Sequence, residues 1–333
     1  MVSQQLFIRH AVDESPAPPD AGKLAADNAH ERDRLIGFKD EGHFYLVRHE
    51  KSNTLLKLLR SVSGLYGRYF GMFDSTGSAR SVFKKKKRIH RESPYYWLIE
   101  AQDDPDDEEA CVEEIQRVWT MGGTRAADNG TLAHLDCELH LNDAEPRAER
   151  AQPTTNRSRK IKLMSDAATR WIDEVAIEEY GWEPFRTEYS LFIDGKAVTD
   201  DHDCDGDLLE RHQYLVAGQA DALFHHPETG QFHLVDWKFC QSSKLDKDAG
   251  TFNGRLPMGT GPLADVPDNS YGHYLSQQSI YAFVLKKRYG IHVTSARLLH
   301  VPSDEPEPVA REIVLDLLPD ETVRRMFSGI VDA

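Results

Sequence analysis

Two alternating apolar segments joined by a short polar turn constrain the fold of this chain more than any other feature. Residues 213–224 and 231–239 both have the pattern of strands, and the turn between them contains Pro227, Glu228, Thr229 and Gly230. The strand period of two divides the second segment between two faces: Val235, Trp237 and Phe239 on one, and Leu234, Asp236 and Lys238 on the other. The pattern predicts a β-hairpin that has one face in the core and two charges on the other.

Those two charges need a partner or a role, because an unpaired charge in an apolar strand costs several kcal/mol, roughly. The preceding strand carries another acid, Asp221, which a short turn can bring beside Asp236. Two close carboxylates repel each other unless a cation lies between them, and oxygen ligands suit Mg²⁺ or Mn²⁺. With Lys238 beside the metal, the group has the parts that phosphodiester hydrolysis requires: Lys238 can stabilise charge on a phosphate, or orient or deprotonate a water.

A simpler interpretation makes Asp236 and Lys238 an ion pair within one strand and makes Asp221 a cap beside the turn. Five short motifs in a fixed order favour the catalytic interpretation instead. They are Gly130-Thr-Leu-Ala-His134, with Glu138 four residues on; Thr187-Glu188-Tyr189; Gly218-Gln-Ala-Asp221; Asp236-Trp-Lys238; and Gln277-Gln-Ser-Ile-Tyr281. Their order and spacing over residues 119–301 resemble the PD-(D/E)XK nuclease superfamily, in particular RecB-type exonucleases and their relatives in large DNA viruses. Residues 43–74 resemble the N-terminal region of the viral members less specifically.

The resemblance implies a role for each motif. It makes His134 a metal ligand together with Asp221 and Asp236, and it makes Asp221, Asp236, Lys238 and Glu188 the catalytic group. Gln277 and Tyr281 would present an amide and a phenol to phosphate or to an active-site carboxylate. Physical reasoning supports the first motif, since His134 and Glu138 are four residues apart and share one helix face. Two plainer roles stay open: Glu188 as a surface acid of an edge strand, and Tyr281 as a residue that packs its helix against the sheet.

The fold expected from these patterns is α/β, with a PD-(D/E)XK core in which helices flank a central mixed β-sheet. Residues 11–34 lack apolar periodicity and predict a loose extension. The further elements expected are strands at 43–47, 187–193 and 294–301, and helices at 54–69, 115–139, 161–180 and 274–288. We therefore expect a flexible extension over 1–35, a helical, DNA-guiding region over 36–110, and the nuclease core over 111–333.

The charge balance restricts how such a chain can bind DNA. With 40 Lys and Arg against 55 Asp and Glu, the net charge of −15 argues against a uniform positive field that coats a duplex. The positive charge must therefore be local. The basic run Lys84, Lys85, Lys86 and Lys87 precedes Tyr95, Tyr96 and Trp97, a combination that single-strand binders use to follow the backbone and stack on bases. The alternative is a solvated loop followed by three core rings.

Several features are absent from the sequence. No apolar stretch approaches the roughly 20 residues that cross a bilayer, and the first ten residues do not have the pattern of a secretory signal. We therefore expect an intracellular protein, in the cytoplasm or the nucleus or nucleoid, with no membrane partner. The four cysteines, Cys111, Cys137, Cys204 and Cys240, have no close pair, which predicts reduced structural thiols. Because no cysteine follows Cys240, we expect no iron–sulfur cluster of the kind that several RecB-type subfamilies hold with C-terminal cysteines.

Together these patterns predict a metal-dependent DNA exonuclease that acts at single-stranded or duplex ends in repair, recombination or replication. A structure-specific endonuclease on the same fold is one alternative, since fold alone does not set the mode of attack. A catalytically silent nucleic-acid-binding module is a second, and a small-molecule phosphoesterase is a third.

Overall fold

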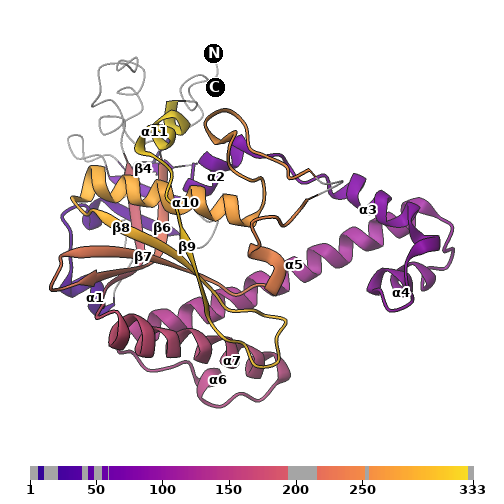
Figure 1. Ribbon diagram of the computed structural model, residues 1–333, viewed down its shortest axis with the longest axis horizontal. Coiled ribbons are helices and arrows are strands. Elements are labelled where there is room, and N and C mark those ends of the chain that lie inside the picture. The colour runs from indigo at the N-terminus through magenta and orange to yellow at the C-terminus, as the bar shows by residue number, and fades with distance from the viewer. Residues whose placement is uncertain are drawn as a thin grey trace. The chain divides into compact units, whose positions relative to one another are not determined.

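The computed structural model describes residues 7–10, 22–39, 44–48, 55–58, 60–193, 216–251 and 255–328, and the chain forms two compact units (Figure 1). Residues 1–70 and 133–333 form the first unit, and residues 71–132 form the second. Some expected residues lie outside the described ranges. They are the first residues of the strands expected at 213–224 and 43–47, the first residue of the helix expected at 54–69, and Cys204.

A mixed five-stranded sheet is the centre of the first unit. Its strands are β5 (Glu183–Ile193), β6 (Val216–His226), β7 (Gln231–Lys238), β8 (Val293–His300) and β9 (Arg311–Leu315), in that order across the sheet. Only β7 and β8 run parallel. The predicted hairpin is confirmed as β6 and β7. Because β7 is the middle strand, Leu234 and Trp237 on its opposite faces are both at most 1% exposed.

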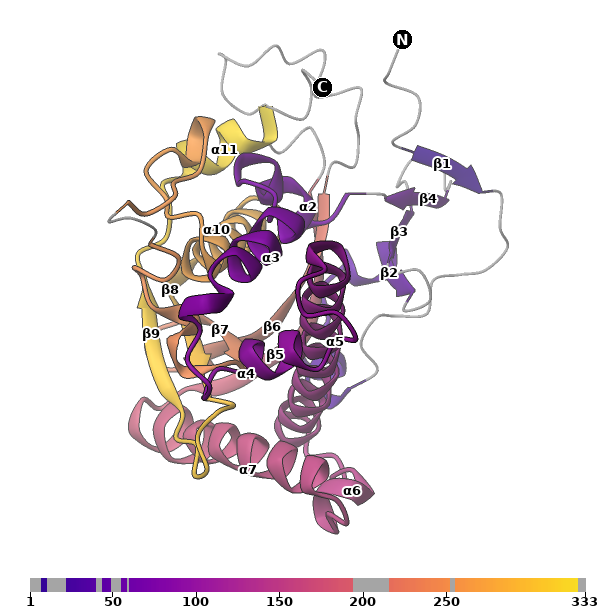
Figure 2. The same ribbon diagram turned by 90° about the vertical axis from the view of Figure 1, so that its right-hand side faces the viewer.

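Helices cover both faces of this sheet (Figures 1 and 2). On one face lie α2 (Val62–Tyr66), α10 (Ser270–Val284, continued by π-helical turns over Leu285–Tyr289) and α11 (Asp320–Ser328). On the other lies α7 (Asn156–Trp171, continued over Ile172–Glu179), whose Trp171 ring stands edge-on to Trp237 at 6.4 Å. The expected α/β architecture, a mixed sheet flanked by helices, is confirmed. Short turns complete the unit: η2 (Gly67–Tyr69), α6 (Ala148–Ala151), η5 (Ser242–Leu245) and η6 (Gly261–Leu263).

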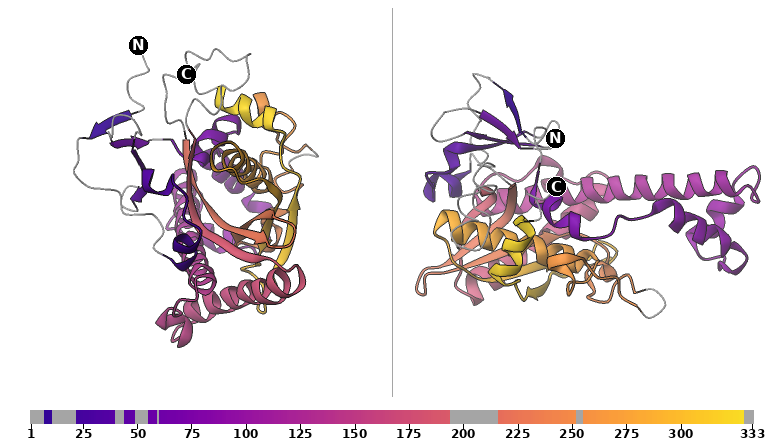
Figure 3. Two further views of the ribbon diagram at one scale, coloured as in Figure 1. Left: turned by 90° about the vertical axis from the view of Figure 1, so that its left-hand side faces the viewer. Right: turned by 90° about the horizontal axis from the view of Figure 1, so that it is seen from above.

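The helix predicted over 54–69 is wrong in its first half. Residues Leu55–Leu58 form a strand, β4, in a second, four-stranded antiparallel sheet (Figure 3). Its other strands are β1 (Phe7–His10), β2 (Ile36–Lys39) and β3 (Phe44–Arg48), in the order β1-β4-β3-β2. The closely spaced leucines fit either structure, and the real helix start is set by Ser61, whose side chain accepts a hydrogen bond from the Gly64 amide at 3.1 Å.

The loose extension expected up to residue 35 is also corrected. Residues 22–35 contain α1 (Lys23–Asp27) and a 3-10 turn, η1 (Asp33–Leu35), and they pack on β5. Asn28 Nδ2 donates to the Phe185 carbonyl at 2.9 Å, and Arg32 Nη2 donates to that of Phe192 at 3.2 Å. These anchors are single polar side chains, so apolar periodicity does not reveal them. Residues 36–70, expected in a separate region, likewise belong to the unit that holds the five-stranded sheet.

The second unit is helical. It contains α3 (Ser75–Lys84), a 3-10 turn, η3 (Lys86–Arg88), α4 (Pro94–Glu100) and the first part of α5, a helix that runs over Glu108–Leu141. Ala79, Phe83, Ile99, Val112 and Ile115 form its small apolar core. Even α5 lacks the apolar character that a membrane-spanning helix needs, and so do the other helices of the described residues.

The cysteines of the described residues, Cys111, Cys137 and Cys240, are free thiols. Cys111 and Cys137 are buried on α5. The burial of these two agrees with the expected role of structural thiols. Burial also raises the pKa of the Cys240 thiol to about 11, which disfavours a reactive thiolate at that position.

Gly218 lies where β6 meets α2 and α10, and the fit leaves no room for a side chain. A Cβ at this position would lie 2.7 Å from Val62 Cγ2 and 2.8 Å from Tyr281 Cε1. We expect Gly218→Ala to lower the free energy of unfolding by about 1–3 kcal/mol, as over-packing does in other cores. Denaturant unfolding measures this, with Gly67→Ala as the control because a Cβ there meets nothing within 4 Å. Equal stability of the two variants would contradict the prediction.

Candidate metal centre

Three acids lie in one row across neighbouring strands of the five-stranded sheet. The register pairs Ala222 on β6 with Thr187 on β5 and with Val235 on β7. Each of these three residues has an acid as its neighbour in the chain: Glu188 follows Thr187, Asp221 precedes Ala222, and Asp236 follows Val235. Like charges side by side on neighbouring strands destabilise a sheet, so this row needs a compensating charge.

Glu188 reaches the row through an irregular backbone. Its φ of 45° is in the left-handed region, which costs a residue other than glycine of order 1 kcal/mol or more. The alternation of β5 breaks at this point: Arg186 and Tyr189 are three residues apart, yet the guanidinium of Arg186 lies 3.9 Å from the centre of the Tyr189 ring. Gln219 Nε2 donates to the Glu188 carbonyl at 2.9 Å and holds this conformation. Glu188 is therefore not an ordinary surface acid of an edge strand.

His134 on α5 completes a group of three possible ligands. Its Nδ1 lies 3.4 Å from Asp221 Oδ2 and 4.0 Å from Glu188 Oε1. The ligand atoms of His134, Glu188 and Asp221 all lie within 4.8 Å of one another. The side chains of His134 and Glu188 are each 25% exposed, so an ion or a substrate can reach the group from solvent. The sequence predicted that His134 and Asp221 would meet, and the structure adds Glu188 to them.

Asp236 lies next to this group but is not one of the three. Its Oδ2 forms an ion pair with Lys238 Nζ, and its Oδ1 accepts a hydrogen bond from Gln278 Nε2 at 3.0 Å. Lys238 Nζ is also 4.0 Å from Asp221 Oδ2, which in turn accepts a hydrogen bond from the Trp237 amide at 3.0 Å. Lys238 therefore bridges the two acids of the hairpin. Asp236 lies outside the group of three, and its expected role as a metal ligand stays a prediction.

Sequence reasoning missed Gln278. The expected residue was its neighbour Gln277, which donates to Tyr281 Oη at 3.3 Å, while Tyr281 itself is 3% exposed and packs against Gly218. The plainer role of Tyr281, packing α10 on the sheet, is thus present, and binding of phosphate by Gln277 and Tyr281 stays a prediction. No sequence signal distinguished Gln278 from Gln277. In the structure Gln278 lies four residues after Tyr274, whose ring centre is 4.4 Å from Lys238 Nζ, so both side chains face the site.

Burial and the neighbouring charges shift the pKa values of all five ionisable groups of the site. Burial raises the pKa of Asp236 to about 7, with a further contribution from the charge of Asp221, and burial also raises the pKa values of Asp221 and Glu188. Burial lowers the pKa of His134 to about 4, so its imidazole is neutral at pH 7. Burial opposes the charge of Lys238, but Asp236 and Asp221 outweigh it and raise the pKa of Lys238 above its ordinary value. One ammonium therefore faces three buried carboxyl groups, each of which holds its proton more tightly than an exposed acid does.

This donor set fits a divalent cation. A neutral imidazole and two carboxylates offer one nitrogen and several oxygens, which suits Mn²⁺ and is compatible with Mg²⁺. Burial raises the pKa values of the three acids, and in Glu188 and Asp236 repulsion from neighbouring acids adds to it. A bound cation would offset that repulsion in place of protons.

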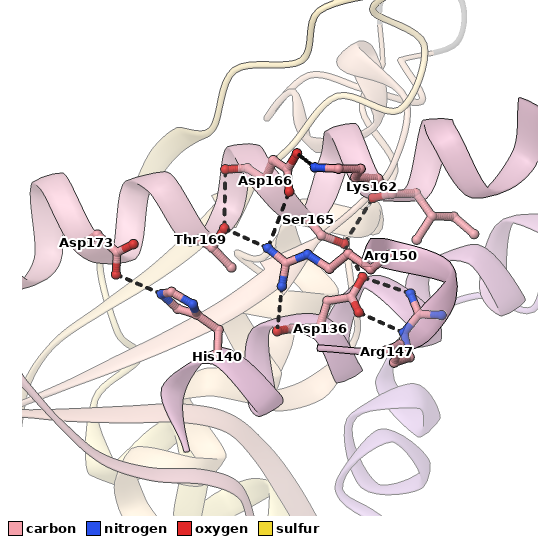
Figure 4. A network of polar contacts seen from close by, with 10 residues as sticks. Asp136, His140, Arg147, Arg150, Lys162, Ser165, Asp166, Thr169 and Asp173 are labelled. Carbon is pink, nitrogen blue, oxygen red and sulfur yellow. Dashed lines mark hydrogen bonds and ion pairs between the residues drawn. The ribbon is translucent and has the colours of Figure 1, made fainter. Parts of the chain in front are cut away.

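A second polar network holds α5 two residues beyond His134 (Figure 4). Asp136 is fully buried and accepts two hydrogen bonds from Arg147, at 2.7 and 2.8 Å, and one from Ser165 Oγ on α7 at 2.6 Å. Nearby, a cavity of about 410 Å³ is lined partly by His140, Arg150 and Lys162. All three already have partners: His140 pairs with Asp173, Arg150 contacts Asp166 and Thr169, and Lys162 pairs with Asp166. We interpret the network as a brace that fixes the position of His134.

The basic run of the second unit is partly neutralised within that unit. Lys86 forms an ion pair with Asp106 and donates to the Pro105 carbonyl at 2.9 Å. Tyr95 Oη accepts a hydrogen bond from Trp119 Nε1 at 3.0 Å, whereas Trp97 is 63% exposed. Lys84 and Lys85 are exposed, and the Lys87 side chain lies outside the described residues. Lys86 and Tyr95 thus have structural partners, and a DNA-guiding role for the run stays a prediction.

Comparison with known proteins gives no match: no family model and no curated protein matches this chain. The site itself offers three acids in a row, a lysine between Asp221 and Asp236, and a neutral histidine beside Asp221 and Glu188.

Proposed function

We propose that this chain is a metal-dependent nuclease that hydrolyses phosphodiester bonds of DNA, preferentially at single-stranded or duplex ends. The observation that carries the proposal is the meeting of His134, Glu188 and Asp221 with the pair Asp236 and Lys238 at the middle strands of the sheet. Motifs that lie up to about a hundred residues apart in the sequence thus meet in space, as the resemblance to PD-(D/E)XK nucleases of the RecB type requires. The preference for ends rests on that resemblance.

The roles follow from the geometry. His134, Glu188 and Asp221 would hold Mg²⁺ or Mn²⁺, which when bound lowers the pKa of a water and neutralises charge on the phosphate. In the reaction a water oxygen bonds to phosphorus, and the bond from phosphorus to the leaving sugar oxygen breaks. The water gives up a proton to solvent, and the leaving oxygen takes up a proton from solvent to become a hydroxyl. Lys238 is protonated because its pKa is raised, so it stabilises the negative charge that grows on the phosphate oxygens rather than acting as a base. Asp236, fixed by Gln278, aims Lys238 at that position.

The test is digestion of end-labelled linear DNA and closed circular DNA, each single- and double-stranded, with Mg²⁺, Mn²⁺ or excess chelator. We expect linear DNA to be shortened from its ends only when metal is present, and circular DNA to stay intact. Asp236→Asn, which removes a charge without changing volume, controls for contaminating nucleases.

Other outcomes identify the alternatives. Cutting of circular DNA would indicate an endonuclease on the same fold. Binding of DNA without any cleavage would indicate a silent binding module, and hydrolysis of bis(p-nitrophenyl) phosphate alone a small-molecule phosphoesterase. Cleavage at the full rate in excess chelator would exclude the metal centre.

A further inference from the structure

The short helix α4 of the second unit (Figure 2) turns two of its three aromatic rings away from the core of that unit. Tyr95, Leu98 and Ile99 are spaced by three and four residues, and all three pack in the small apolar core. Tyr96 and Trp97 follow Tyr95 directly, so the helical period places them on the other side. Trp97 is 63% exposed and Tyr96 is partly exposed. The core therefore accounts for Tyr95 and leaves two rings without a packing role.

The two outward rings and one arginine form a single surface. Tyr96 and Trp97 stand edge to face, with their ring centres 5.2 Å apart and their planes at 86°. Arg91 is exposed, and its guanidinium carbon lies 5.9 Å from the centre of the Tyr96 ring. We call Arg91, Tyr96 and Trp97 the ring platform. A single exposed ring is common on protein surfaces, but adjacent rings with a cation beside them combine apolar faces with a positive charge.

The charge around the ring platform is positive. Residues 84–91 contain six lysines and arginines and no acid, in a chain whose net charge is −15. Lys86 has an acidic partner. Lys84, Arg88 and Arg91 are exposed and form no ion pair with an acid among the described residues. Because η3, which ends at Arg88, packs on α4, this charge stays beside the rings. The surface therefore suits an anion that also has flat apolar parts.

We propose that the ring platform stacks on an unpaired base of single-stranded DNA, and that Lys84 and Arg88 contact phosphates of the same strand. Every base has a π face, and stacking combined with a basic surface is how proteins bind single strands without sequence preference. In a duplex the neighbouring bases cover both faces of each base, so the ring platform selects single strands. The inference rests on the proposed nuclease function for DNA as the polymer, and it names the form of DNA that is bound.

The test is binding of two fluorescein-labelled strands to the full chain, followed by anisotropy in chelator so that no cleavage occurs. One strand is oligothymidylate, and the other is an abasic strand of the same length, with the phosphates and sugars but no bases. We expect wild type to bind oligothymidylate about tenfold more tightly, as base stacking on aromatic side chains does elsewhere. Tyr96→Ala/Trp97→Ala should lose this preference, and Trp97→Phe, which keeps a ring, should retain most of it.

The charges are tested with the same two strands over a series of salt concentrations. Lys84→Gln/Arg88→Gln should weaken the binding of both strands alike, because phosphate contacts do not depend on bases. The slope of log affinity against log salt should fall by about 0.7 for each phosphate contact that is lost. A slope equal to that of wild type would remove these two residues from the site.

Phe73→Ala is the matched control for the rings. Phe73 is 74% exposed in the same unit, and no basic side chain of the described residues lies over its ring. This variant should bind both strands as wild type does. Thermal unfolding confirms that each variant is folded.

Three outcomes would overturn the inference. The first is equal affinity of wild type for the two strands. The second is an equal loss of affinity for both strands in Tyr96→Ala/Trp97→Ala, because the rings would then support the unit rather than stack on bases. The third is a loss of base preference in Phe73→Ala as large as that in the double variant, because stacking would then not belong to the ring platform.

The two proposals fail in different ways, since binding is measured without metal. If wild type prefers oligothymidylate but never cleaves it when Mn²⁺ is added, the nuclease function is wrong and the ring platform stands. If wild type cleaves DNA and binds the two strands equally, the ring platform is wrong and the nuclease function stands.

Discussion

Asp221→Asn should abolish metal-dependent DNA cleavage and, in the same protein, the stabilisation by Mn²⁺. Asp221 is the residue that links the site, because it contacts His134, lies in the group with Glu188, and accepts a hydrogen bond from the Trp237 amide. Asparagine keeps the volume and the hydrogen bond but removes the charge. A catalytic cation contributes several kcal/mol to the transition state, so we expect cleavage to fall about a thousandfold or more.

Single-turnover digestion of linear DNA measures the rate, and thermal unfolding with and without Mn²⁺ measures binding. An ion that binds only the folded state at a hundred times its dissociation constant stabilises that state by about 2.7 kcal/mol, so the wild-type melting temperature should rise with Mn²⁺. That of Asp221→Asn should not. Without metal the variant should be at least as stable as wild type, because it removes one of three crowded carboxylates.

Asp320→Asn is the matched control. Asp320 is an acid of the same unit that pairs with Lys286 at 2.7 Å, away from the row of three acids and from the network around Asp136. This variant should keep the cleavage rate and the response to Mn²⁺. Normal cleavage or an unchanged Mn²⁺ response in Asp221→Asn would remove Asp221 from the metal centre.

The centre of the site could be predicted because it lies on regular structure. Strict alternation fixed the face of Asp236 and Lys238, and a short turn placed Asp221 on the adjoining strand, so the hairpin alone brought these three residues together. His134 needed more than local pattern, since a single histidine on a helix has many roles. Only its place in the order of motifs made it a ligand candidate, and the structure then placed its Nδ1 3.4 Å from Asp221.

The rest depends on features that a local pattern does not carry. The positive φ of Glu188 breaks the alternation of its strand, so a period of two gives no information on where its carboxylate points. Gln278 was missed because two adjacent glutamines occupy different helix faces, and only the packing of α10 on β7 decides which one meets Asp236. The leucines around Leu55–Leu58 satisfy the periods of both a helix and a strand, so their pattern does not predict the strand that they form.

Lys238→Met should separate catalysis from DNA binding. Removing one group that stabilises charge in the transition state costs about 10²–10³ in turnover. Affinity should change little, since the many phosphate contacts of a bound strand remain. Single-turnover rates at saturating protein and dissociation constants in chelator measure the two quantities. If affinity collapses while bound DNA is cut at the normal rate, Lys238 is a binding residue only.

The same substitution should also make stability in chelator more sensitive to pH. The folded-state pKa of Asp236, about 7, is above its ordinary value of about 3.9, so between these values the folded protein holds a proton that the unfolded chain has lost. Stability therefore falls as pH rises through this window.

Lys238→Met removes the cation that pairs with Asp236. The folded-state pKa of Asp236 then rises further, so stability keeps falling to a higher pH, and the loss above that pH is about 3 kcal/mol. Adding Asp236→Asn should restore stability at high pH without restoring turnover, because the buried charge is gone and the ammonium is still absent. A double variant as unstable at high pH as Lys238→Met would show that Lys238 stabilises the fold by packing rather than by its charge.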